Sequence, residues 1–308
     1  MKVIFLGTPA FAETILRAIC RSSHRVSAVV TQPDRVNARG GKTIASPVKQ
    51  AAEELGLPIH QFERISREGV EILRAYQADI MVTAAYGQIL SREILSLCPY
   101  GVINVHGSLL PKYRGACPVQ CSILNGEKEI GVSIMQTEYE VDSGSVILVK
   151  KILLDGNENC AEATAKLAVA GAEAIVEALD QIEAGRAVFT PQDPGKATFC
   201  KKICKEDGRI DFSRSAADIK NQIRAYTPWP SAYTETPFGM LKILRAEVVE
   251  GEFPGEPGEV VVSDKNGILI KCGRDALRPT EVQAEGSRAM DAASFLRGHA
   301  IGKGTKLL

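Results

Sequence analysis

The sequence has no CxxC pair among its eight cysteines, and only four histidines occur in 308 residues. Cys117 and Cys121, and likewise Cys200 and Cys204, are four residues apart, but no histidine lies beside either pair. A zinc site built from cysteine and histidine ligands is therefore not expected. Scattered thiols in apolar contexts are typical of proteins kept in a reducing compartment. We predict a protein that needs no metal.

Long hydrophobic runs are also missing. No stretch approaches the ~20 apolar residues that a helix needs to cross a bilayer, so no membrane association is expected. The first residues form a short apolar run that is interrupted by Pro9 and Glu13, unlike the longer core of a signal peptide. We therefore expect a cytoplasmic location, with the first strand beginning at once.

The chain has no net charge, because 37 Lys and Arg balance 37 Asp and Glu. This balance excludes a uniformly basic coat for nucleic acid but leaves room for local basic patches. Two segments are locally basic, each with a charge of +4. The first basic segment, 35–49, has no acid and contains Arg35, Arg39, Lys42 and Lys49. The second basic segment is 186–205, which contains Lys201 and Lys202. Alternatively, the cations of these two segments belong to an ordinary solvated surface and bind no partner.

A dinucleotide-binding fingerprint is absent as well. Gly7-Thr8-Pro9 follows the first apolar run, where α/β proteins place ligand loops, but it is not GxGxxG. Pro9 stands in place of a flexible glycine, so a nicotinamide-dependent enzyme is disfavoured.

The pattern of the chain predicts two domains. In residues 1–185, apolar runs alternate with amphipathic segments, which favours strands buried on both faces of a doubly wound, Rossmann-like α/β sheet. We expect strands at 3–6, 26–31, 79–84, 102–105, 131–135 and 146–154, and helices at 11–21, 47–55, 66–76, 118–125 and 160–184. Residues 186–205 are expected to form a basic linker. Residues 206–308 begin with a helix at 215–226 and then are mostly β, with a hairpin turn at Asn266-Gly267, which suits a small open, OB-like barrel.

The densest chemical signal is the segment 101–115. Asn104 and His106 lie two residues apart near the end of a predicted strand, so their side chains share one face. An amide donor beside an imidazole suits the stabilisation of a developing oxyanion together with proton transfer near pH 7. Asp142, in a loop after a later strand, could reach His106. The alternatives are a core histidine bonded to a backbone carbonyl and, for Asp142, a simple turn.

These motifs resemble the folate-dependent formyltransferases that use 10-formyltetrahydrofolate, and in particular their tRNA-acting branch. The resemblance covers nearly the whole chain and rests on 3–12, 31–35, 46–49, 85–87, Asn104, His106, 108–111, 113–116, Asp142, 202–211 and 228–233. The sequence departs from the branch at Ser91, where proline is usual, at Cys117, where alanine is usual, and in the loop 35–42.

The resemblance implies a formyl transfer to the amino group of methionine on initiator methionyl-tRNA. It implies that Asn104 and His106 stabilise the tetrahedral intermediate and that Asp142 holds His106. It assigns a folate site to Gln88, Ile89, Leu90, Ser108, Leu109, Leu110 and Pro111, and contacts with methionine or tRNA to Phe11, Arg35, Arg39, Lys42, Lys201 and Lys202. The second domain is expected to contact tRNA, and the expected state is a monomer.

Two other functions remain open at this point. A formyltransferase that acts on a sugar nucleotide would share the three catalytic residues, although the two basic segments argue against it. A catalytically idle RNA-binding protein on the same scaffold is disfavoured because Asn104, His106 and Asp142 are all present.

Overall fold

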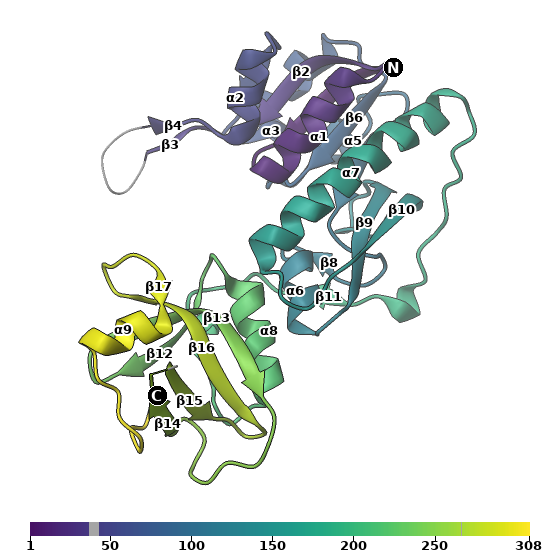
Figure 1. Ribbon diagram of the computed structural model, residues 1–308. Coiled ribbons are helices and arrows are strands. Elements are labelled where there is room, and N and C mark those ends of the chain that lie inside the picture. The colour runs from purple at the N-terminus through teal and green to yellow at the C-terminus, as the bar shows by residue number, and fades with distance from the viewer. Residues whose placement is uncertain (37–42, 266) are drawn as a thin grey trace. The chain divides into compact units, whose positions relative to one another are not determined.

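The computed structural model describes residues 1–36, 43–265 and 267–308 (Figure 1). The chain forms two compact units, of which unit 1 comprises Met1–Pro118, Glu129–Leu153 and Thr164–Cys200, and unit 2 comprises Val119–Lys128, Leu154–Ala163 and Lys201–Leu308. Arg39, Lys42 and Asn266, which carried sequence-based predictions, lie outside the described residues.

Unit 1 is a doubly wound α/β domain, as predicted. Its main sheet has the order β10-β9-β7-β6-β1-β2-β5. Its strands are β1 (Lys2–Gly7), β2 (Arg25–Thr31), β5 (Ile59–Gln61), β6 (Ile80–Ala84), β7 (Val102–His106), β9 (Glu129–Gln136) and β10 (Val146–Leu153). Neighbours from β5 to β7 are parallel, whereas β9 runs antiparallel to both β7 and β10. The short β5 was missed, because three half-buried residues carry little periodic signal.

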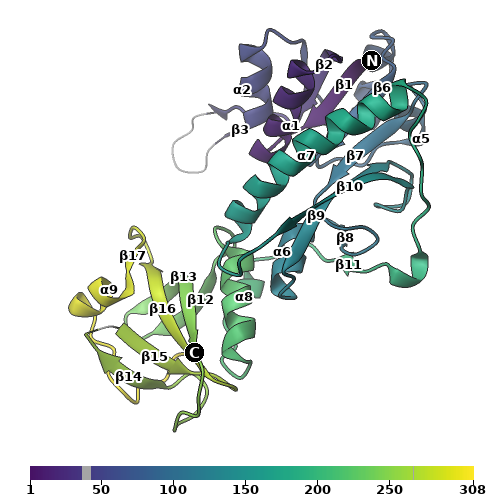
Figure 2. The same ribbon diagram turned by 45° about the vertical axis from the view of Figure 1, so that its right-hand side comes forward.

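Helices cover both faces of this sheet. They are α1 (Ala10–Arg21), α2 (Pro47–Glu54), α3 (Ile65–Glu68), α4 (Val70–Arg74), α5 (Arg92–Leu95) and α7 (Cys160–Glu183). In both views α1 and α7 lie on the same face of the sheet (Figures 1 and 2). A Cβ at Gly171 of α7 would lie 3.0 Å from Val105 on β7 and 3.6 Å from Ile15 on α1, so helix and strand pack closely there. On the other face, Ile4 and Leu6 pack with residues of α3, α4 and α5.

Local sequence signals explain how several elements begin. Ser46 caps α2, because its side chain accepts a hydrogen bond from the Lys49 amide while Pro47 occupies the first turn. At the end of β1, a Cβ on Gly7 would come within 2.6 Å of the Ala12 Cβ, so the turn into α1 requires glycine. This turn brings the start of α1 to the carboxyl edge of the parallel strands, the edge where ligands bind in such folds.

Unit 2 is an OB-like antiparallel β domain. Its sheet has the order β12-β13-β16-β15-β14, with β17 beside β16. The strands are β12 (Ala232–Thr236), β13 (Gly239–Val249), β14 (Val260–Asp264), β15 (Gly267–Lys271), β16 (Ala276–Ala284) and β17 (Met290–Asp291). Helices α6 (Pro118–Leu124), α8 (Ala216–Tyr226) and α9 (Ala292–Gly298) complete the described helices of the chain. The predicted helix at 215–226 and the hairpin β14–β15 are present, and Ile219 and Ile223 of α8 face a core shared with Ile243 of β13.

The segment expected to be a linker is partly built into unit 1. Thr190 exchanges two backbone hydrogen bonds with Val146 on β10, with N–O distances of 2.8 and 2.9 Å. Further on, β11 (Phe199–Cys200) pairs in parallel with β8 (Arg114–Gly115), and the two lie side by side in Figure 2. Gly, Pro and Lys content indicated an irregular path but could not reveal that this path is hydrogen-bonded to a distant loop.

One further short pair of strands is described. The strands β3 (Arg35–Val36) and β4 (Thr43–Ile44), both within the first basic segment, form an antiparallel pair. No helix among the described residues has the length and apolar character needed to span a membrane.

Candidate active site

His106 and Asp142 come together at the carboxyl edge of the sheet. His106 ends β7, and Asp142 lies in the loop between β9 and β10. The His106 Nδ1 atom is 3.6 Å from Asp142 Oδ2, and both side chains are largely shielded from solvent. The strand β9 runs away from His106, since Ser133 pairs with His106 and the last residue, Gln136, pairs with Ile103. The loop after β9 therefore turns back to bring Asp142 to the histidine. The sequence-based expectation that the Asp142 loop reaches His106 therefore matches the geometry.

The other ring nitrogen of His106 determines how the imidazole is protonated. Nε2 lies 2.9 Å from the backbone carbonyl oxygen of Tyr113. Because a carbonyl oxygen only accepts hydrogen bonds, Nε2 is the donor and carries a hydrogen. Nδ1 is thereby left to exchange a proton on the side that faces Asp142. The core-histidine alternative is thus correct for one nitrogen, while the other remains available for chemistry.

Asp142 is hydrogen-bonded by a backbone amide two residues after Tyr113, the residue that binds His106. Its Oδ2 accepts a hydrogen bond of 2.7 Å from the Gly115 amide. Gly115 has a φ of +114°, and a Cβ there would lie 2.7 Å from the Cys200 carbonyl oxygen, so glycine is required. The loop that carries Tyr113 and Gly115 therefore contacts both members of the His106–Asp142 pair.

Asn104 is oriented by Thr83 on the neighbouring strand β6. The Thr83 hydroxyl donates a 2.8 Å hydrogen bond to Asn104 Oδ1. Because the amide oxygen is engaged by this hydroxyl, the amide nitrogen keeps its hydrogens for another acceptor. Asn104 and His106 are alternate residues of β7 and so project from the same face. Sequence reasoning did not single out Thr83, since a threonine inside an apolar run is usual for a strand.

The loop 108–111, assigned to folate by resemblance, is stabilised from within. Ser108 is fully buried, and its hydroxyl donates a 2.6 Å hydrogen bond to the Lys112 carbonyl oxygen. The Ser108 carbonyl oxygen accepts a 2.7 Å hydrogen bond from the Ser133 hydroxyl. The Ser133 hydroxyl oxygen also accepts from the Leu110 amide. Ser108 therefore shapes the loop, whereas Leu109, Leu110 and Pro111 are half-buried and keep exposed apolar surface.

The second folate segment follows β6. Gln88 uses its side-chain amide to bind the backbone of Phe62 and Ile65, at 2.8 and 2.9 Å. Leu90 is buried in the core, whereas Ile89 is 83% exposed. Of these three residues, Ile89 offers a side-chain surface to a ligand, and Gln88 fixes the loop that presents it.

The residues expected to contact methionine or tRNA lie at separate places. Phe11 is half-buried in the first turn of α1, beside the end of β1. Arg35 is exposed on β3, and Lys201 and Lys202 are exposed after β11. Lys49 is different, because its ammonium binds the Asp34 carboxylate. This hydrogen bond and a second one from Gln61 lower the pKa of Asp34. The first basic segment is thus weaker than its sequence suggested, since the compensating acid lies just before it.

One group of metal-ligating side chains occurs within the described residues, formed by His24, Asp180 and Glu183. It lies at the amino end of β2, whereas His106 lies at the carboxyl end of β7 in the same sheet. Glu183 Oε1 accepts a 2.7 Å hydrogen bond from the Met1 amino group. The group is therefore remote from the candidate active site.

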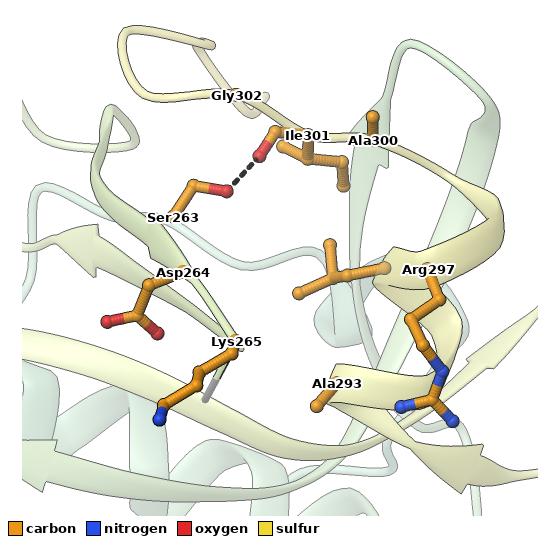
Figure 3. Close-up of a pocket in the computed structure, with 9 residues that line it drawn as sticks. Ser263, Asp264, Lys265, Ala293, Arg297, Ala300, Ile301 and Gly302 are labelled. Atoms are coloured by element: carbon orange, nitrogen blue, oxygen red, sulfur yellow. Dashed lines mark hydrogen bonds between the residues drawn. The ribbon is translucent and has the colours of Figure 1, made fainter.

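A hollow of about 390 Å³ lies in unit 2 between β14 and the segment from α9 to Gly302 (Figure 3). Ser263 donates to the Ile301 carbonyl at 2.8 Å along its rim. Lys265 and Arg297 also line it, but none of the described residues predicted for the site does. The candidate catalytic residues Asn104, His106 and Asp142 lie instead in unit 1.

Asn104, His106 and Asp142 lie at the carboxyl edge of a doubly wound sheet, where α/β enzymes bind their ligands. The formyl transferase model matches residues 1–179, and the model of the formyl transferase C-terminal domain matches 202–300. This chain belongs to the formyl transferase family and is a formyltransferase.

Curated relatives agree with this assignment, and solved structures share the fold. The chain is 42% identical to "Methionyl-tRNA formyltransferase" of Lachnospira eligens, over 100% of this chain and 99% of the relative. It is also 42% identical to the protein of that name from Neisseria meningitidis, over 100% of both chains. An N-formyltransferase from Helicobacter canadensis, in complex with folinic acid and dTDP-3-aminofucose, has the same fold, with a TM-score of 0.66 at 18% identity over 91% of this chain and 99% of that one. HypX from Aquifex aeolicus with tetrahydrofolic acid gives a TM-score of 0.63 at 18% identity, over 96% of this chain and 47% of that one.

Proposed function

We propose that this protein transfers the formyl group of 10-formyltetrahydrofolate to the amino group of methionine on initiator methionyl-tRNA. The observation that carries the proposal is 42% identity, across both domains, to relatives that bear the name methionyl-tRNA formyltransferase. The likeness to sugar N-formyltransferases is one of fold, at 18% identity. The acceptor is therefore assigned from the full-length relatives.

The residues of the candidate site have the chemistry that this reaction needs. The methionine nitrogen attacks the formyl carbon, a C–N bond forms, and the carbonyl electron pair moves to oxygen. Asn104 donates to this oxyanion through the amide hydrogens that Thr83 leaves unused. His106, with Nε2 fixed by Tyr113, contributes its Nδ1 side to the same centre.

The collapse of the intermediate requires a proton to move. The attacking nitrogen becomes an ammonium and must lose a proton, and N10 of the folate must gain one as its bond to carbon breaks. The carboxylate of Asp142 and the Nδ1 atom of His106, 3.6 Å apart, are the groups placed to pass that proton. The products are formylmethionyl-tRNA and tetrahydrofolate, so atoms and charge balance.

The two substrates would bind on different surfaces of the same sheet edge. Ile89 and the loop from Leu109 to Pro111 offer apolar surface for the pterin and its neighbouring ring, while Gln88, Leu90 and Ser108 hold those loops in shape. Phe11 would contact the methionine side chain. Arg35, Arg39, Lys42, Lys201 and Lys202 would contact tRNA phosphates, in a protein that works in the cytoplasm without a metal.

A single assay tests the proposal. The protein is mixed with 10-formyltetrahydrofolate and methionine-charged initiator tRNA, and the tRNA is analysed for formylmethionine. A parallel reaction offers an amino-sugar nucleotide as the acceptor. Formylation of the tRNA with an inert sugar supports the proposal, and the reverse pattern would replace it by the sugar-modifying alternative.

A further inference from the structure

Gln192 lies in the segment expected to be a linker. Both the oxygen and the nitrogen of its side-chain amide form hydrogen bonds beside the candidate active site. Its Oε1 accepts hydrogen bonds from Arg114 Nε and Nη2, at 3.0 and 2.8 Å. Its Nε2 donates to the backbone carbonyl oxygens of Asp142 and Gly144, at 2.9 and 2.7 Å. Two acceptor and two donor positions are thus filled, which is the full capacity of a glutamine side chain.

The loop that Gln192 binds holds Asp142 in a demanding conformation. Asp142 has a φ of +51°, in the left-handed region that non-glycine residues rarely adopt. At Gly144 a Cβ would lie 1.9 Å from the Gln136 carbonyl oxygen, so the loop passes very close to the end of β9. Such a conformation persists only where surrounding contacts determine it. Gln192 supplies two of those contacts, one to the carbonyl of Asp142 itself.

Through Arg114, Gln192 also contacts the loop that binds His106. Arg114 is 8% exposed and stands between Tyr113, whose carbonyl binds His106, and Gly115, whose amide binds Asp142. The Arg114 amide donates to the Thr198 carbonyl at 2.8 Å. The segment from Thr190 to Thr198 therefore links the Asp142 loop to the loop that fixes the imidazole.

We propose that Gln192 is a positioning residue that sets the approach of Asp142 to His106. It touches neither reacting atom and acts through the backbone of Asp142. The inference rests on the proposed function, because it takes formyl transfer as the reaction that Asp142 serves. It assigns a role in catalysis to a segment whose composition indicated a basic linker between domains.

Two substitutions separate the bonds that Gln192 makes. Gln192→Met keeps the length of the side chain but removes all four hydrogen bonds. Gln192→Glu keeps the acceptor for Arg114 but sets a carboxylate oxygen against the two carbonyl oxygens. Both variants are expected to lower kcat about tenfold or more, because buried polar groups lose their partners, with little change in KM for the folate. Gln181→Met is the matched control and should keep the wild-type kcat, because this half-buried side chain of α7 donates to Glu177 and contacts neither Asp142 nor Arg114.

A double-mutant cycle distinguishes positioning from a general structural effect. If Gln192 acts through Asp142, then adding Gln192→Met to Asp142→Ala causes little further loss of kcat. If the two losses multiply instead, or if Gln192→Glu has the wild-type kcat, the inference is wrong. Melting temperatures show whether the variants fold, and Gln192→Glu provides the test if Gln192→Met does not. A wild-type protein that formylates no charged tRNA would overturn the proposed function and this inference with it, whereas active wild type with unimpaired Gln192 variants would overturn the inference alone.

Discussion

His106 Nδ1 and Asp142 Oδ2 lie 3.6 Å apart although 36 positions separate the two residues in the chain. The separation is longer than that of a direct hydrogen bond. Asp142 Oδ2 is meanwhile bonded to the Gly115 amide, and His106 Nε2 to the Tyr113 carbonyl. Each side chain is therefore fixed by the backbone of the same loop.

Replacement of Asn104, His106 or Asp142 by alanine should lower kcat far more than it weakens folate binding. Loss of one donor to an oxyanion typically costs on the order of 10²–10³ in kcat. Single-turnover formylation and folate titration measure the two effects separately. His60→Ala is the control, since that ring binds the Tyr76 hydroxyl and none of the three residues. A His106→Ala enzyme with near-normal turnover would rule out the assigned role.

Thr83→Val should reduce kcat without unfolding the protein. The substitution is close in shape but removes the hydroxyl that engages Asn104 Oδ1, so the amide loses its fixed orientation. A hydrogen bond of this kind contributes about 1 kcal/mol, which corresponds to a loss of roughly fivefold in kcat. Thr83→Ser retains the hydroxyl and should retain most of the activity. Equal kcat values for the valine and serine variants would contradict the orienting role.

Alanine substitutions of Arg35, Arg39, Lys42, Lys201 and Lys202 should raise KM for tRNA and leave KM for the folate unchanged. Each cation that neutralises a phosphate contributes ~0.7–0.9 to the slope of log affinity against log salt concentration. The salt dependence of tRNA binding should therefore become flatter by about that amount per variant. Equal effects on the two substrates would show that these residues shape the active site instead.

Lys49→Ala provides the contrast within the same basic segment. Its ammonium already binds Asp34, and this contact lowers the pKa of the Asp34 carboxyl. A carboxyl with a lowered pKa stabilises the fold above its unfolded pKa and loses that contribution as the pH falls. Lys49→Ala should therefore reduce stability at neutral pH, with little difference from wild type in strong acid, and should leave the salt slope for tRNA unchanged. A flattened slope would place Lys49 among the tRNA contacts.

The thiols of Cys98 and Cys272 should resist alkylation in the folded protein. Burial raises the pKa of Cys98 to about 11 and that of Cys272 to about 12. At pH 8 almost none of either thiol is the reactive thiolate, and both side chains are also inaccessible. Mass spectrometry after iodoacetamide treatment, with and without denaturant, measures the alkylated fraction of each thiol.

Formyl transfer should remain intact in the presence of a chelator and of a strong reductant. If the protein holds one equivalent of zinc and loses activity when the zinc is removed, that expectation is wrong.

The sequence by itself determined the fold class and most of the elements of this protein. The apolar runs at 3–6, 26–31, 79–84 and 102–105 correspond to β1, β2, β6 and β7, because strands buried on both faces need continuous apolar residues. The helices predicted at 47–55 and 215–226 correspond to α2 and α8, and each begins at a serine whose side chain accepts a hydrogen bond from a nearby backbone amide. Asn104 and His106 could be placed on one face from their spacing alone, since alternation along a strand is a local property.

Tertiary structure alone decided how the residues of the site are held. Thr83 orients Asn104 because β6 and β7 are neighbours in the sheet. This order of strands cannot be read from a local sequence pattern. Asp34 neutralises Lys49 across 15 positions, so a count within the basic segment overstated its free charge. Gln192 binds Arg114 and the Asp142 loop from 78 and 50 positions away, respectively. Periodicity and capping arise from neighbours in the chain, whereas these contacts arise from packing between distant segments, and only the folded chain brings them together.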